Sequence, residues 1–171
     1  LSTSLLVLPS IRALICCSHF PRADCSSRSF WACCAPWAPY ISPTTDTFDQ
    51  LRQRSPLLLF CLLAVSSRFH DNPAFAHFAE QQALTHMRNT LYSTEPPKLA
   101  DLKGSLLYNA WMSRGAPPGH SVSLALQLEL PGSLKKLISA LALPMQQAKQ
   151  AFEAYMPSVR TWLSLYCQEI W

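Results

Sequence analysis

The string Gly119-His120-Ser121-Val122-Ser123 places a serine beside a histidine and behind a glycine. In the G-x-S-x-G nucleophile elbow, a sharp turn between a strand and a helix exposes such a serine for attack on an acyl group. Histidine is the usual base for a serine nucleophile. Ser121 is therefore the strongest candidate for catalytic chemistry in this chain, with His120 or another histidine as its base.

The surroundings of Ser121 weaken that interpretation. The fifth position of the string is Ser123 instead of glycine, and the loop-forming pair Pro117-Pro118 stands where the elbow requires a strand. We therefore expect a helix start, in which Ser121 or its neighbours satisfy free backbone amides, and no enzyme activity. A serine hydrolase that uses Ser121 in a degenerate elbow remains the alternative.

The histidines do not have the spacing of metal ligands. His77 and Glu80 are one helical turn apart but have no second helical ligand, and His86 falls on a different face. Zinc sites usually combine C-x-x-C or H-x-x-x-H pairs, and neither spacing occurs. We expect no metal and no cofactor in this chain.

Charge and glycine content argue against a nucleic-acid or phosphate site. The net charge is +4, and its densest basic groups are only the pairs Arg52 with Arg54 and Lys135 with Lys136. Four glycines cannot build a phosphate-binding loop. Asp49, Asp71 and Asp101 stand near expected helix starts, where a carboxylate favours the helix dipole, so we assign them no acid–base role.

The seven cysteines indicate a reducing compartment, because their number is odd and their spacing is uneven. Cys61 and Cys167 lie in apolar helical contexts, where a free thiol behaves as a small core residue. The longest apolar run, Leu57 to Val65, has nine residues. A membrane-spanning helix needs about 20, so no membrane segment is expected.

The elements that must position these residues are predicted to be helices. Hydrophobic residues make up 49% of the chain, and fourteen prolines against four glycines favour helices that begin at proline. Ser55-Pro56 and Asn72-Pro73 are such starts, the first opening a helix to about Phe69 that is apolar nearly all round. The second helix carries a stripe at four-residue spacing, formed by Phe75, Ala79, Ala83, Met87 and Leu91.

Further helices are predicted along the rest of the chain. One covers residues 99–111, one is capped by Ser133 and is kinked or split at Pro144, and the last begins at Pro157. Residues 115–119 form a loop. Residues 122–130 alternate in the manner of a strand, but we predict a helix because no partner strand is evident.

The predicted fold is therefore an irregular all-α arrangement of several helices with two regions. Residues 1–47 form a Ser/Cys/Pro-rich segment of low order that is not necessarily native sequence, and residues 48–171 form the helical region. The chain starts without methionine, and its last helix ends without a capping signal, so a truncated fragment is expected.

Residues 36–171 resemble the fungal-specific transcription factor domain, the middle homology region of fungal zinc binuclear cluster regulators. Residues 39–45 read PYISPTT and residues 54–68 read RSPLLLFCLLAVSSR, which together are similar to the entry of that domain. Residues 99–111 read LADLKGSLLYNAW, similar to its S-x-x-D-x-Q-A-L-L-L-L-x-x-W helix. Residues 160–166 read RTWLSLY, similar to its R-x-W-x-x-L-Y helix.

The resemblance implies a regulatory domain fragment in a nuclear transcription regulator. In that family a six-cysteine zinc cluster binds DNA, and the cysteines of this chain do not fit the cluster's spacing. The implied partners are transcriptional machinery or a second copy, a small-molecule effector, and DNA only through the missing cluster. We expect Arg68, Trp111, Arg160 and Trp162 to form the structural and regulatory core. The effector, the target genes and the oligomeric state do not follow from the residues.

Overall fold

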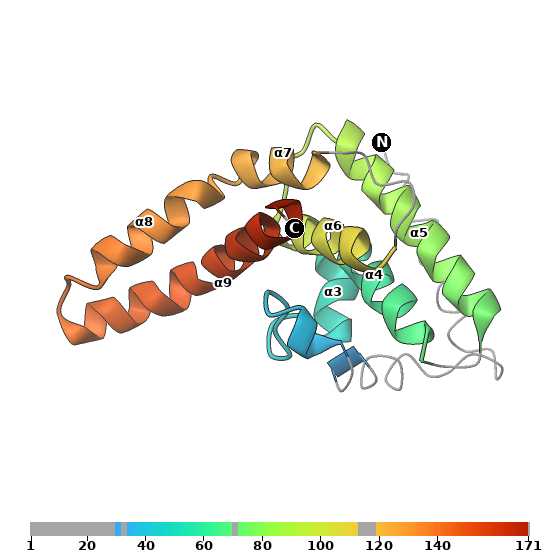
Figure 1. Cartoon of the computed structure of the whole chain (residues 1–171), viewed down its shortest axis with the longest axis horizontal. Helices are drawn as coiled ribbons and strands as arrows, with labels where there is room; N and C mark the ends of the chain where they lie inside the picture. Colours follow the sequence, from blue (N-terminus) through green and yellow to red (C-terminus); the bar gives the residue numbers. More distant parts are fainter. Residues whose placement is uncertain (1–29, 32–33, 70–71, 113–118, 171) are drawn as a thin grey trace.

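A computed structural model describes residues 30–31, 34–69, 72–112 and 119–170 (Figure 1). Over these residues it contains α-helices and one 3-10 turn and no strand, which confirms the all-α prediction. The elements in chain order are η1 Ala35–Trp37, α3 Phe48–Arg54, α4 Pro56–Ser67, α5 Pro73–Tyr92, α6 Leu99–Trp111, α7 His120–Gln127, α8 Leu130–Ala140 and α9 Met145–Ile170.

Helix α4 lies at the centre of the fold. Its start is fixed by Ser55, whose Oγ accepts a hydrogen bond from the Leu58 N–H at 3.3 Å, and by Pro56 in the first turn. Every residue from Leu57 to Ser67 is buried, as predicted for a helix that is apolar all round. Cys61 in its middle is fully buried, and this burial raises the pKa of its thiol.

Helices α5 and α6 cover α4. Asn72 caps α5 as predicted, accepting a hydrogen bond from the Phe75 N–H at 3.0 Å. The inward stripe of α5 is confirmed for Phe75 through Met87, whereas Leu91 at its C-terminal end is 38% exposed. Helix α6 approaches α4 closely at Gly104. A Cβ at this position would lie 2.8 Å from Leu57 Cγ and 3.0 Å from the Leu58 backbone nitrogen.

The core also includes the segment before α3. Phe30, Cys34, Ala38, Tyr40 and Ile41 are buried within the main cluster, so the low-order prediction for residues 1–47 does not describe residues 34–47. Burial of these apolar groups outweighs the local Pro/Ser composition on which the prediction was based. Residues 1–29 lie outside the described residues, and the prediction for them stays a prediction.

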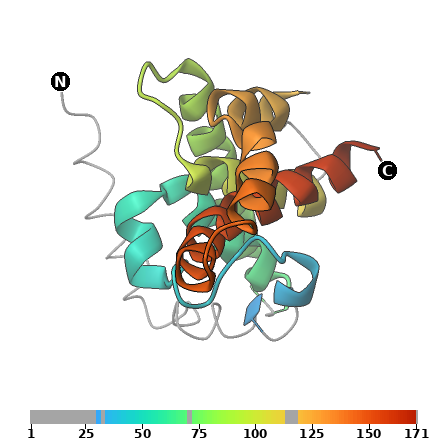
Figure 2. The same ribbon diagram turned by 90° about the vertical axis from the view of Figure 1, so that its left-hand side faces the viewer.

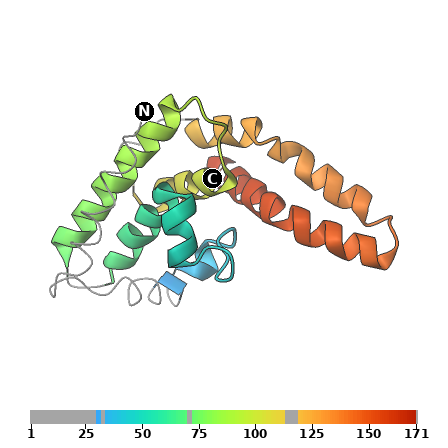
Figure 3. The same cartoon turned by 180° about the vertical axis from the view of Figure 1, so that it is seen from behind.

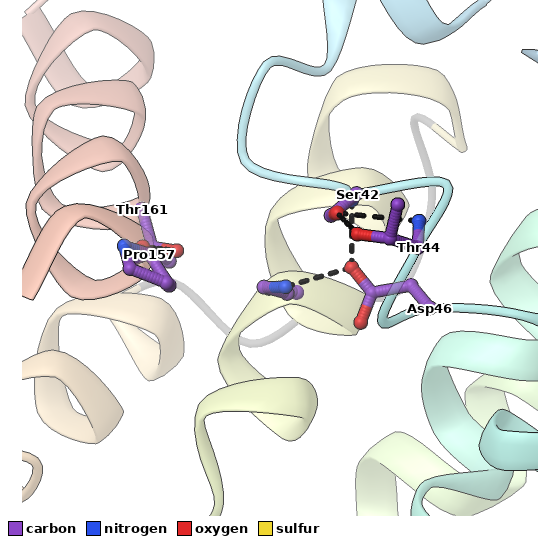
Figure 4. Close-up of polar contacts among 6 residues, drawn as sticks. Ser42, Thr44, Asp46, Pro157 and Thr161 are labelled. Atoms are coloured by element: carbon purple, nitrogen blue, oxygen red, sulfur yellow. Dashed lines mark hydrogen bonds and ion pairs between the residues drawn. The ribbon is translucent and has the colours of Figure 1, made fainter. Parts of the chain in front are cut away.

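A buried ion pair fastens this segment to α6. Lys103 Nζ lies 2.8 Å from Asp46 Oδ2, with both side chains less than a tenth exposed. The same carboxylate oxygen accepts a hydrogen bond from the Ser42 N–H at 2.8 Å (Figure 4). The Ser42 and Thr44 hydroxyls lie 2.9 Å apart, and the hydrogen bond between them also stabilises the turn at residues 42–46.

Residues 122–130 are helical in large part, as α7 extends to Gln127 and α8 begins at Leu130. The prediction of a Ser133 cap is wrong: Ser133 lies inside α8 and is buried. The helix begins earlier because Glu129, with a φ of 53°, turns the chain, and Pro131 then occupies the first helical turn. The predicted loop at 115–119 falls largely on residues outside those described; Gly119, with a φ of 74°, precedes α7.

The prediction that a helix starts at Pro157 is also wrong, because α9 runs through it from Met145 to Ile170. The split near Pro144 is confirmed. Val159 and Leu165 of α9 are buried, and α9 packs against α6, so tertiary contacts hold the helix together across the proline. The Thr161 hydroxyl donates a hydrogen bond to the Pro157 carbonyl at 2.7 Å (Figure 4).

Helices α8 and α9 pair antiparallel and extend away from the body formed by α3 to α6. Figures 1 and 3 show this pair from opposite sides, and in Figure 2 it points toward the viewer. We call the pair from Leu130 to Val159 the arm. Within the described part of the chain, none of the helices has the length and apolar character required to cross a membrane.

Candidate functional site

A polar cavity lies where four helices meet. It has a volume of about 280 Å³ and opens between the first turns of α4 and α6, the C-terminal part of α5 and one side of α7. Its charged and imidazole-bearing lining residues are Arg54, His86, Glu95, Lys98, Asp101 and His120. The remaining wall is formed by apolar and neutral polar residues of the same helices and of the 93–98 connection.

Asp101 has a structural task in this cavity. Its Oδ2 accepts a hydrogen bond from the Lys98 N–H at 3.0 Å, which caps the first turn of α6. Its Oδ1 accepts one from the Ser55 hydroxyl at 3.2 Å and so connects the starts of α6 and α4. The expected position of Asp101 near a helix start is confirmed.

Two histidines line the cavity, of which His120 is buried and His86 is half-buried. His120 is 6% exposed, and its Nε2 has no hydrogen-bond partner among the residues that the structure describes. Burial lowers its pKa, and the negative charge of Asp101 opposes this shift in part. His86 stacks on Phe60 with ring centroids 5.4 Å apart, and burial lowers its pKa as well. Both imidazoles are therefore neutral at neutral pH and can exchange hydrogen bonds with a bound molecule.

The lowered pKa values of these two histidines predict that the folded chain loses stability in mild acid. Because the pKa of each is lower in the folded chain than the ordinary value near 6.5, the unfolded chain binds more protons as the pH falls below that value. The free energy of unfolding should fall as the pH drops through the ordinary histidine pKa near 6.5 and below it. Urea melts of the wild type and of the variant H86F/H120F would measure this.

The two substitutions keep ring-shaped side chains, and H86F keeps the stack on Phe60. The variant should show a flatter pH profile across the same range. An equally steep profile in both proteins would mean that other groups cause the acid sensitivity.

Ser121 lies in a different environment from the one a nucleophile needs. It is the second residue of α7, has no exposed surface, and its Oγ lies 2.7 Å from that of Ser105. The Asn109 side-chain amide donates a second hydrogen bond to it at 3.1 Å. Ser121 thus connects α6 to α7, and this position within a helix does not match the exposed turn of a nucleophile elbow.

A fluorophosphonate probe should therefore fail to label the folded chain, because the probe cannot reach a fully buried hydroxyl. Ser121→Ala should instead lower the free energy of unfolding by about 1–2 kcal/mol, since Ser105 and Asn109 lose their partner. Gel fluorescence and a urea melt check the two results. Labelling that the alanine variant abolishes, with an unchanged melt, would restore the hydrolase interpretation.

The four residues predicted as a structural and regulatory core are placed differently from one another. Trp111 and Trp162 are half-buried and pack against the main core. Arg68 is exposed at the C-terminal cap of α4. Arg160 is exposed on α9, where it lines a groove of about 400 Å³ with residues that include Trp37 and Tyr40. Only the two tryptophans thus have the packing expected of core anchors.

Sequence reasoning missed the cavity and the ion pair. Lys103 follows Leu102 in an apolar helix, which signals a buried charge, but its partner Asp46 lies 57 positions earlier. The sequence analysis treats His86 as an isolated residue and weighs His120 only as a base for Ser121, whereas the fold brings both to one cavity. Among the described residues, no three histidine, cysteine, aspartate or glutamate side chains come together as a metal site would require.

Comparison with protein-family models, with curated proteins and with solved structures finds no match to this chain.

Proposed function

We propose that this chain is a regulatory, non-catalytic module of a nuclear fungal transcription regulator. It acts on a DNA-binding module that its sequence does not contain. Its partners in this role are transcriptional machinery and a small-molecule effector.

The observation that carries the proposal is the placement of the three strings similar to the fungal transcription factor domain. Residues 54–68 include all of α4, residues 99–111 form α6, and residues 160–166 belong to α9. Helix α6 packs against both α4 and α9. Strings far apart in the sequence thus meet at one helix, as expected if they are parts of one domain.

The cavity beside His120 supplies a mechanism for regulation. A small polar molecule bound there would contact α4, α5, α6 and α7 together, since all four line the cavity. A ligand shifts an equilibrium only by its difference in affinity for the two states. Contacts to four helices provide that difference if their relative positions change between an active and an inactive state.

A reporter assay tests the proposal. The full chain is fused to a heterologous DNA-binding domain in a yeast strain whose reporter carries the matching operator. Expression should change at least about threefold relative to the DNA-binding domain alone, a difference of about 0.65 kcal/mol. A fusion of Gly104→Val, which perturbs the α4–α6 contact, should lose the effect. An unchanged reporter, with a fusion that is present in the nucleus and melts cooperatively, would overturn the proposal.

A further inference from the structure

A groove runs along the C-terminal part of α9. On the α9 side its lining residues are spaced by three, one and three positions, which places them on one side of the helix: Arg160, Leu163, Ser164 and Cys167. The opposite wall consists of Trp37, Pro39 and Tyr40, which precede α3. The groove volume of about 400 Å³ lies within the range of small-molecule sites, about 300–1,000 Å³.

Both walls offer exposed apolar surface to a ligand. Trp37 is 77% exposed and Leu163 is 46% exposed. Removing apolar surface from water is favourable. A ligand with a hydrocarbon body therefore gains free energy when it covers these two side chains.

Arg160 is the only charged residue among the described residues that line the groove. Residues 35–45 and 154–168, the two stretches that form the groove, contain no aspartate, glutamate, lysine or histidine and no other arginine. Among the described residues, no carboxylate oxygen lies within the 4.0 Å of an ion pair to Arg160. Its guanidinium is therefore available to an anionic group of a ligand.

The acidic residues that flank these positions on α9 stand outside the groove. Glu153 is seven residues before Arg160, which places it on the same side of α9 but about 10 Å further along the helix, and it does not line the groove. Glu169 occupies a position about half a turn around α9 from Cys167. The described lining thus combines apolar walls with one cation and no acidic residue.

We propose that this groove binds a small amphipathic carboxylate, in which a single carboxylate is attached to a hydrocarbon body. The carboxylate pairs with the Arg160 guanidinium, which can donate two parallel hydrogen bonds to its oxygens. The hydrocarbon body lies along Leu163 and against Trp37. A phosphate monoester fits less well, because it carries nearly two negative charges and the groove supplies one cation.

Ligand-observed NMR titrations of the full chain test this inference. From Arg160 to Cys167 the groove side of α9 is about 10 Å long, so the probes carry a hydrocarbon chain of medium length. The probes are octanoate, octanol and octylammonium, which share this chain and differ in charge. Octanoate should bind at least about tenfold more tightly than octanol, a difference of about 1.4 kcal/mol, and octylammonium should bind more weakly than either. The octanoate affinity should fall as salt is added.

Variants connect the binding to the groove. Arg160→Gln should bring the octanoate affinity within about twofold of the octanol affinity, with the thermal melt retained because Arg160 is exposed. Arg68→Gln, at an exposed arginine outside the groove, is the matched control and should keep the wild-type preference. Trp37→Ser should weaken octanoate and octanol alike, at least about threefold, because both lose the same apolar contact.

Absence of octanoate binding would overturn the inference, as would equal affinity of the wild type for octanoate and octanol. So would a preference for octanoate that Arg160→Gln retains, or octanoate binding that Trp37→Ser does not weaken. The inference rests on the groove alone and does not depend on the proposed function, so a silent reporter leaves it standing.

Discussion

Replacing Gly104 with valine should lower the free energy of unfolding by about 3 kcal/mol, at the upper end of the usual cost of overpacking. The first added carbon would lie 2.8 Å from Leu57 Cγ and 3.0 Å from the Leu58 backbone nitrogen. The side chain of Leu57 has little room to move because it is only 2% exposed. Helices α4 and α6 must therefore separate, and urea denaturation followed by circular dichroism would measure the loss.

Gly132 provides the matched control for this experiment. It lies within α8, and a Cβ there would meet no atom within 4 Å. Gly132→Val should therefore leave stability unchanged within about 0.5 kcal/mol, since the open surface accepts the side chain. Equal losses in the two valine variants would show that the close α4–α6 approach is not what requires glycine at residue 104.

Replacing Lys103 with methionine should cost about 3–5 kcal/mol, because it leaves the Asp46 carboxylate buried without its counter-charge. Lys103 Nζ and Asp46 Oδ2 are 2.8 Å apart and both side chains are almost fully buried. Loss of the pair should also release the 38–46 segment from α6. Urea denaturation measures the cost, and proteolysis of that segment under native conditions would report the release.

A second substitution separates loss of the pair from loss of packing. In K103M/D46N the buried charge is gone, and the amide oxygen of asparagine can still accept the hydrogen bond of the Ser42 N–H. The double variant should recover at least half of the stability lost in Lys103→Met. A double variant no more stable than the single one would show that the methionine side chain itself is not accommodated.

Local rules predicted the helices whose starts are marked by a cap and a proline together. Ser55-Pro56 and Asn72-Pro73 each supply a side-chain acceptor and a fixed φ, and both helices begin there. Pro157 follows Met156, which has no capping oxygen, and there the chain continues as a helix. The absence of a cap was the signal that distinguished this proline from the other two.

The contents of the candidate site were harder to predict because they depend on contacts between distant parts of the chain. His86 and His120 come from α5 and α7, and nothing in the spacing of 34 residues brings them to one cavity. Ser121 was weighed as a nucleophile or a cap, and it is a buried link to Ser105 on α6. The sequence predicts that a residue lies in a helix, but it does not predict which residue of another helix packs against it.

The fully buried thiol of Cys61 in α4 can serve as a probe of how often the core opens. The thiolate is the nucleophile that attacks an alkylating reagent, so Cys61 should react only in molecules whose central helix has come out of the core. Cys167 is exposed and should react in the native chain, which calibrates the reagent within the same sample. The ratio of the two alkylation rates, resolved by peptide mass spectrometry, then gives the population of opened molecules under native conditions, without denaturant.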